Sequence, residues 1–168
     1  MKHNFPPFSD SALWKLSRKQ RERTPRALAL YLVARAKQYF NTDELAVLFC
    51  HKDTEYAGLP GVHLWYRERN ALLYPGPFPI IAHPPCAAFG RFKKRSTQPA
   101  LPSILCVHLA ELYGGVIEQP ATSCLFRLCA PPGFIETIRQ SAFGYPTEKL
   151  THLFWVSRPA PPLAPQGR

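Results

Sequence analysis

Leu45-Ala46-Val47-Leu48-Phe49-Cys50 is the stretch that decides the fold. Its apolar residues run on without the polar alternation of a half-exposed strand, which is typical of a parallel strand buried on both faces. A helix is predicted just before it, over residues 25–40, because Thr24-Pro25 matches an N-cap followed by proline at the first helical position. A helix followed by such a strand indicates an α/β fold.

The rest of the chain repeats this alternation of short apolar runs and helical segments. The expected strands are residues 62–66, 78–82, 116–118 and 150–156. The expected helical segments are residues 68–72, 101–113 and 123–128, and residues 134–140 are expected to be irregular or helical. In the helix over 101–113, the residues expected to face the core are Ile104, Leu105, Leu109 and Leu112. The alternation predicts a largely parallel sheet.

Length and charge suggest the organisation of the chain and its partners. The 168 residues suit one domain, and the net charge of +10 indicates a polyanionic partner, with nucleic acid as the first choice. Residues 1–41 are expected to form a basic helical N-terminal extension and residues 42–156 the α/β domain. Residues 157–168 are expected to be a proline-rich disordered tail.

The cysteines and the apolar runs bear on the compartment. Five cysteines, an odd number, match no secreted disulfide framework. The N-terminus lacks the apolar core of a signal peptide, and no apolar run approaches the ~20 residues of a membrane span. The sequence therefore predicts a reduced cytoplasmic compartment and no membrane partner.

A rigid thiol follows the third expected strand, in His83-Pro84-Pro85-Cys86. Each proline fixes φ near −65°, and the basic residues after Cys86 favour its thiolate, the form that attacks carbon. Asp53 and Glu118 follow two other strands, at the edge where open α/β sheets bind ligands. We expect Cys86 to attack C6 of a pyrimidine, burial to raise the pKa of Glu118 so that it protonates N3, and His83 to act as a base or orient substrate.

A basic loop comes directly after the thiol. Its members are Phe89, Arg91, Lys93, Lys94 and Arg95. The cations suit phosphate contacts and the aromatic ring suits base stacking. Asp53 and Thr54 lie where an α/β enzyme usually meets its cofactor or ribose.

Plainer interpretations stand beside these. Cys86 can be a small buried hydrophobe, His83 can bond only to backbone, and the basic loop can be a solvated run of charge. The spacing of His83, Cys86, Cys124 and Cys129 is compatible with zinc, but proline between the first two ligands is awkward, and we expect no metal.

Three short motifs, in this order, resemble the DNA cytosine-C5 methyltransferases of the small kind found in phages and prophages. Pro84-Pro85-Cys86 matches the family's catalytic Pro-Cys loop, and Val116–Pro120 resembles the strand that carries its Glu-Asn dipeptide, with glutamine in place of asparagine. Residues 143–151 are similar to its later Tyr-Gly-x-Pro-Gln-x-Arg-x-Arg segment, in which Lys149 and Thr151 occupy the positions of the two arginines.

The resemblance implies a single reduced Rossmann-like domain that methylates a pyrimidine of DNA or of a nucleotide in a bacterial host cell. It makes Cys86 the nucleophile, Glu118 the acid that contacts N3, and S-adenosylmethionine the cofactor. The residues expected to hold the cofactor are Asp53, Thr54, Glu68 and Pro84. The residues expected to contact nucleic acid are Phe89, Arg91, Lys93, Lys94, Arg95, Lys149 and Thr151.

The chain departs from the family at two places. Residues 49–54 replace its Phe-x-Gly-x-Gly-Gly cofactor loop and contain no glycine, and a large target-recognition domain is absent. Two alternatives therefore stay open: a catalytically inactive module that binds nucleic acid or a host protein, and an enzyme that acts on free pyrimidine nucleotides. The oligomeric state is left open.

Overall fold

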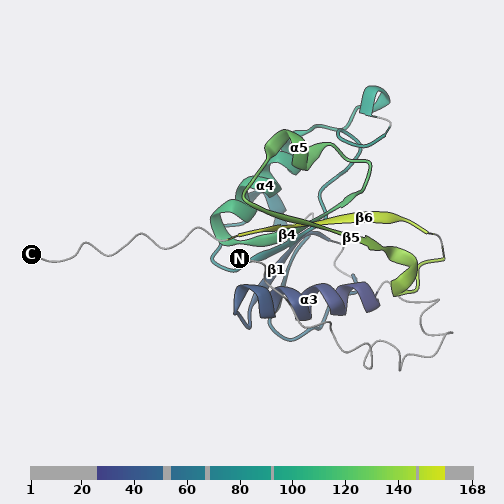
Figure 1. The fold of residues 1–168 in the computed structure, drawn as a ribbon. Coiled ribbons are helices and arrows are strands. Elements are labelled where there is room, and N and C mark those ends of the chain that lie inside the picture. Colours follow the sequence, from purple (N-terminus) through teal and green to yellow (C-terminus); the bar gives the residue numbers. More distant parts are fainter. Residues whose placement is uncertain (1–25, 51–53, 67–68, 92, 147, 158–168) are drawn as a thin grey trace, which may run out of the picture.

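A central β-sheet organises the chain in the computed structural model, which describes residues 26–50, 54–66, 69–91, 93–146 and 148–157 (Figure 1). Within these ranges the sheet has six strands in the order β2-β1-β3-β4-β6-β5. The strands are β1 (Leu45–Cys50), β2 (Val62–Tyr66), β3 (Ile80–Ala82), β4 (Gly115–Pro120), β5 (Gly133–Arg139) and β6 (Leu150–Val156). The fold is a mixed α/β domain of Rossmann-like type with a mostly parallel sheet.

Strand direction brings three chain segments to one edge of the sheet. β1 pairs in parallel with β2 and β3, and β3 pairs in parallel with β4, whereas β6 is antiparallel to both β4 and β5. The register places Val47 beside Ile81 and Ile81 beside Val116. The carboxyl ends of β1, β3 and β4 therefore lie side by side.

Helices cover both faces of the sheet, which explains why β1 is apolar throughout. α3 (Arg26–Phe40) lies on one face, and α4 (Leu101–Tyr113) and α5 (Leu125–Cys129) lie on the other (Figure 1). Val47 packs in the α3 layer and Leu48 in the α4 layer. Each strand residue thus meets a helix whichever face it points to, as in other buried parallel sheets.

The expectation for residues 134–140 is wrong, because residues 133–139 form β5. All seven residues pair with β6 in antiparallel register, from Gly133 beside Val156 to Arg139 beside Leu150. The segment is an edge strand with most of its side chains exposed, so it lacks the apolar run that marked the inner strands. Pairing with β6 and contact with α3, rather than the β-propensity of its own residues, hold this segment in an extended conformation.

The orientation expected for the helix over 101–113 is also partly wrong. Ile104 and Leu112 are exposed, while Ser103, Cys106 and Ala110 face the sheet. The small residues allow close approach of α4 to the sheet: a Cβ at Gly115 of β4 would lie 3.3 Å from the Ala110 Cβ. The inner face of α4 carries small side chains because the helix lies close to the sheet. The hydropathy of the residues does not indicate which face this is.

Other elements are short. They are the 3₁₀ turns η2 (Ala71–Leu73), η3 (Lys93–Arg95) and η4 (Gln140–Phe143). The expected helical turn at 68–72 corresponds in part to η2. Most of the expected N-terminal extension, residues 1–25, and residues 158–168 of the expected tail lie outside the described residues. In the part of the chain that is described, no helix has the length and apolarity needed to cross a membrane.

A half-buried carboxylate on β5 ties the edge strand to α3. Glu136 accepts hydrogen bonds from the Tyr31 hydroxyl (2.9 Å) and from Trp155 Nε1 (3.1 Å), and it pairs with the Arg35 guanidinium. That guanidinium lies 5.1 Å from the centre of the Trp155 ring. Burial raises the pKa of Tyr31 to about 12, so its hydroxyl stays a donor at neutral pH.

Glu136→Gln is expected to lower the free energy of unfolding by about 1–3 kcal/mol, because an amide cannot accept from all three donors and removes the negative charge that faces the Arg35 guanidinium. Urea unfolding followed by circular dichroism measures the loss. Glu148→Gln is the matched control, because its pair with Arg139 is largely exposed, and a change within about 0.5 kcal/mol is expected there. Equal losses in the two variants would contradict this role for Glu136.

Candidate active site at the carboxyl ends of the strands

The Pro84-Pro85 turn is held from both sides through its carbonyl groups. Gln119 on β4 is fully buried, and its Nε2 donates to the Pro84 carbonyl at 2.9 Å. Ser103 on α4 donates its hydroxyl to the Pro85 carbonyl at 2.7 Å. Because proline has no N–H, the carbonyls are the groups by which the turn can be anchored. These two hydrogen bonds therefore fix the position of the backbone at the next residue, Cys86.

Gln119→Leu is expected to destabilise the protein by about 2 kcal/mol, because it leaves the Pro84 carbonyl without its donor and Ser123, whose hydroxyl donates to Gln119 Oε1, without its acceptor. The rate at which Cys86 reacts with iodoacetamide is expected to change with it, since the anchor of the turn is lost. Thermal unfolding and alkylation kinetics measure the two effects. An unchanged rate would show that Gln119 does not fix the thiol.

Cys86 begins a tight turn that connects to the other layer. Its carbonyl accepts from the backbone N–H of Phe89 (3.0 Å) and of Gly90 (2.8 Å). The Phe89 carbonyl in turn accepts from the N–H of Cys124, just before α5. Lys93 Nζ lies 3.3 Å from Cys124 Sγ, which ties η3 to the same point. The Cys86 thiol is half-exposed, and hydrogen bonds hold the backbone around it in place.

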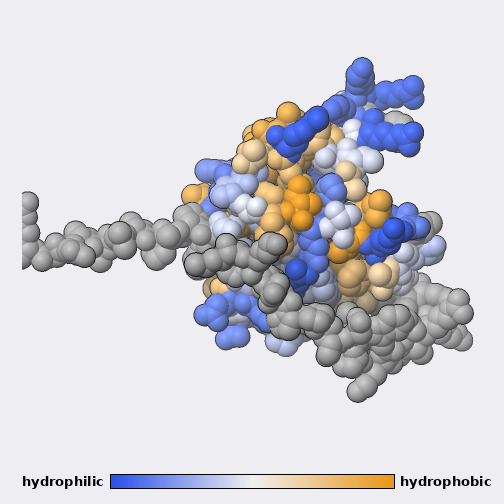
Figure 2. Space-filling model, viewed as in Figure 1, coloured by the Kyte–Doolittle hydropathy of each residue, from blue (hydrophilic) through white to orange (hydrophobic). Residues whose placement is uncertain are grey.

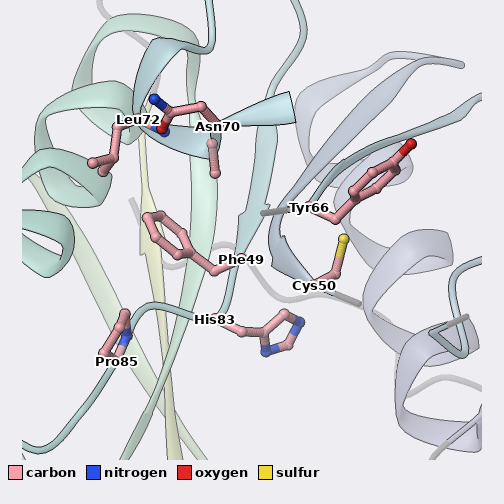
Figure 3. A pocket seen from close by; sticks show the side chains of 8 residues that line it. Phe49, Cys50, Tyr66, Asn70, Leu72, His83 and Pro85 are labelled. Carbon is pink, nitrogen blue, oxygen red and sulfur yellow. The ribbon is translucent and has the colours of Figure 1, made fainter. Parts of the chain in front are cut away.

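One pocket lies at the ends of β1, β2 and β3, and we call it the strand-end pocket. It has a volume of about 380 Å³ and is mainly apolar. Its lining is Phe49, Cys50, Tyr66, Asn70, Ala71, Leu72, His83 and Pro85. Figure 3 shows the Phe49 ring between Leu72 and Pro85, and the His83 imidazole toward Cys50 and Tyr66.

Backbone strain occurs in the wall of this pocket. Phe49 has φ = 59°, and the pairing of β1 with β2 is irregular between Leu48 and Cys50. A bulky residue with positive φ is a true outlier, and such strain is concentrated at binding sites. Asn70 in the lining also has a positive φ, 49°, which asparagine adopts more readily than most residues. These two positions are where the chain brings an aromatic ring and an amide to the strand-end pocket.

A second pocket contains the thiol, and we call it the thiol pocket. Its volume is about 550 Å³ and its lining is Cys86, Ala87, Gly90, Arg91, Arg95, Ser96, Pro120 and Thr122. Arg91 and Arg95 are the charged residues of its described lining, and their positive charge suits an anion. Beside it, the exposed residues of η3 form a hydrophilic projection at the top of the molecule (Figures 1 and 2).

A polar cluster on the α3 side surrounds Glu118. His83 Nδ1 lies 3.3 Å from Glu118 Oε2, and Gln140 Nε2 donates to Oε1 at 3.2 Å. Lys149 Nζ lies 3.8 Å from Oε1. On the far side of the imidazole, the buried Tyr56 hydroxyl lies 2.9 Å from His83 Nε2. Three donors from three different segments therefore converge on one carboxylate.

The expected rise in the pKa of Glu118 is wrong in sign. Burial by itself raises this pKa, but the hydrogen bond and charge of His83, the charge of Lys149 and the hydrogen bond from Gln140 outweigh it, and the net shift is downward. Glu118 is therefore an ionised acceptor at neutral pH. The sequence does not show this, because the contacts of Glu118 with His83, Lys149 and Gln140 are made only in the folded chain.

The structure also corrects three expected contact residues. Phe89 is only 6% exposed and belongs to the core under α4, so it cannot stack on a base. Thr151 is fully buried, and its hydroxyl has no hydrogen-bond partner among the described residues. Pro84 is buried behind Pro85, which lines the strand-end pocket in its place. Each of these three residues is buried in the folded chain, although the sequence motif predicted that it would contact a ligand.

The remaining expected residues are distributed as follows. Arg91 and Arg95 line the thiol pocket, and Lys93 and Lys94 are exposed beside it. The Thr54 hydroxyl donates to Glu55, at 3.0 Å. Asp53 and Glu68 lie outside the described residues. Across those described, no three His, Cys, Asp or Glu side chains are close enough together to hold a metal ion.

No protein-family model matches the chain, and no curated protein matches it either. The two pockets, the turn between them and the cluster around Glu118 are therefore the observations on which a function can be argued.

Proposed function

We propose that this protein modifies a pyrimidine base of a nucleic acid at C5, through a transient thioether between Cys86 and C6 of the ring. One observation carries the proposal: the Pro85-Cys86 turn lies between two pockets, with Pro85 in the wall of one and Cys86 in the wall of the other. A donor on one side and a target base on the other would meet at this turn. The position beyond parallel strand ends is the usual ligand site of such sheets.

The chemistry uses few protein groups. The Cys86 thiolate adds its electron pair to C6, and the C5=C6 pair moves onto C5. C5 then forms a bond to an electrophilic carbon of the donor, while the bond from that carbon to its leaving group breaks and the leaving group keeps the electron pair. Loss of the C5 proton to solvent returns its electron pair to the ring, the C6–S bond breaks, and the thiolate is released. Arg91 and Arg95, in the thiol pocket, supply the charge that holds the phosphate of the target nucleotide.

The strand-end pocket suits a nucleoside-containing donor such as S-adenosylmethionine. Its volume is within the usual range for small-molecule sites, and Phe49 and Tyr66 offer flat apolar surface with the Asn70 amide beside them. S-adenosylmethionine held there would supply the electrophilic methyl carbon. No glycine lies among the lining residues, so side chains rather than bare backbone would meet the ligand.

The test is transfer of labelled methyl groups from S-adenosylmethionine to single-stranded polynucleotides, to duplexes and to free pyrimidine nucleotides. Label on C5 of a pyrimidine is expected in a polynucleotide. Label only on free nucleotides would show that the substrate is the free nucleotide and not the polynucleotide. Salt-dependent binding of polynucleotide with neither transfer nor a thiol adduct would overturn the proposal in favour of an inactive binding module.

A further inference from the structure

Glu118 accepts hydrogen bonds on both of its oxygens and pairs with the Lys149 ammonium at one of them. Oε2 faces His83 Nδ1, and Oε1 faces the Gln140 amide and the Lys149 ammonium. An ionised carboxylate has about four lone-pair sites, so it can take one more donor. From this geometry we propose that the target base is of the uracil type, with a donor at N3 between two carbonyl groups, rather than cytosine. This inference rests on the function proposed above.

The hydrogen-bonding edges of the two bases differ at the ring nitrogen. Uracil carries N3–H, which can donate to the free lone pair of Glu118, and its O2 and O4 are acceptors for donors around that carboxylate. Cytosine carries an acceptor at N3, so it would face Glu118 only with a proton held between them. The three donors disfavour that proton on Glu118, and the lowered pKa of the carboxyl agrees.

The covalent step also favours uracil over cytosine. When the Cys86 thiolate adds to C6 of uracil, the electron pair from the C5=C6 bond is delocalised onto O4 as an enolate. Donors near that oxygen stabilise the charge as it develops. Gln140 and Lys149 have N–H groups beyond those that face Glu118 and can serve as such donors, and no proton has to be placed on the ring first. Cytosine requires protonation at N3 for the equivalent step.

The carboxylate and the thiol pocket lie at the same end of the sheet, because both are reached from the last residues of β4. Pro120 lines the thiol pocket with Cys86, and Glu118 projects from the same face of β4 two residues earlier, about 7 Å along the strand. His83 comes directly after the neighbouring strand β3, three residues before Cys86. A pyrimidine ring that reached from Cys86 toward β4 would present its N3 edge to Glu118.

The experiment measures exchange of the C5 hydrogen in heavy water, which follows thiol addition and needs no methyl donor. The probes are two single-stranded oligonucleotides that differ only in one deoxyuridine or deoxycytidine, incubated with the full chain and read by mass spectrometry. Exchange at uracil at least about 10-fold faster than at cytosine is expected. Faster exchange at cytosine would overturn the inference and leave the function proposed for Cys86 standing.

A second set of probes separates the two proposals further. Oligonucleotides with one 5-fluorouracil or one 5-fluorocytosine are incubated with S-adenosylmethionine, because C5 fluorine blocks the release step and retains the adduct. An adduct with 5-fluorouracil supports both proposals, and one with 5-fluorocytosine alone overturns only the choice of base. No exchange and no adduct with either base would overturn both. Lys149→Met, at an exposed position, is expected to narrow the uracil preference several-fold.

Discussion

Cys86→Ser is expected to lower the rate of base modification by about 10³-fold or more, with the fold intact. Serine keeps the size of the side chain, but its hydroxyl is not ionised at neutral pH and is a far weaker nucleophile than a thiolate. The rate is measured as methyl transfer to a pyrimidine polynucleotide and, without donor, as C5 hydrogen exchange. Both should fall together, because both begin with addition to C6.

Cys129→Ser is the matched control. Cys129 is also half-exposed, but it lies on α5 and lines neither pocket, so both rates should stay within about twofold of the parent. The unfolding free energy of each variant should lie within about 0.5 kcal/mol of the parent protein. A Cys86→Ser protein that keeps most of its activity would contradict covalent catalysis. Equal losses in both variants would point to a general effect of cysteine removal.

The inner sheet could be predicted from sequence because its residues face helices on both sides. The apolar run of Leu45–Cys50 and the helix before it were predicted nearly to their observed bounds, and β6 was predicted at residues 150–156 as observed. β5 could not be predicted in this way, because an edge strand with one covered face carries Glu136 and Thr137 among its apolar residues. Its conformation depends on a partner strand that follows it in the chain.

The candidate site shows the same division between local and long-range information. The rigid turn at Cys86 and its basic loop are contiguous in sequence, and Cys86, Arg91 and Arg95 do meet in one pocket. Gln140 and Tyr56 reach the Glu118 cluster from distant segments, so no spacing rule could have found them. The pKa of Glu118 is lowered against burial by His83 first and then by Lys149 and Gln140, which is why burial alone gave the wrong direction.

Glu118→Gln is expected to lower activity by about 10²- to 10⁴-fold. The amide nitrogen that replaces one carboxylate oxygen must face either His83 or Gln140, and both of these are donors to Glu118 in the parent protein. It also removes the charge that Lys149 meets. Because one buried donor loses its acceptor, the free energy of unfolding at pH 7 should fall by about 1–3 kcal/mol.

The pH dependence of this difference tests the ionisation of Glu118 directly. A carboxyl whose pKa is lowered on folding adds stability above its unfolded pKa and loses it as the pH falls through the folded value. The stability gap between the parent protein and Glu118→Gln should therefore be full above the ordinary pKa of 4.5 and shrink below it. Urea unfolding from pH 7 down to pH 3 measures the gap. Glu111→Gln, at a half-exposed position on α4, should show little gap at any pH. A gap that grew on acidification would mean that Glu118 is held protonated in the folded protein, which would restore cytosine as the better fit to the site.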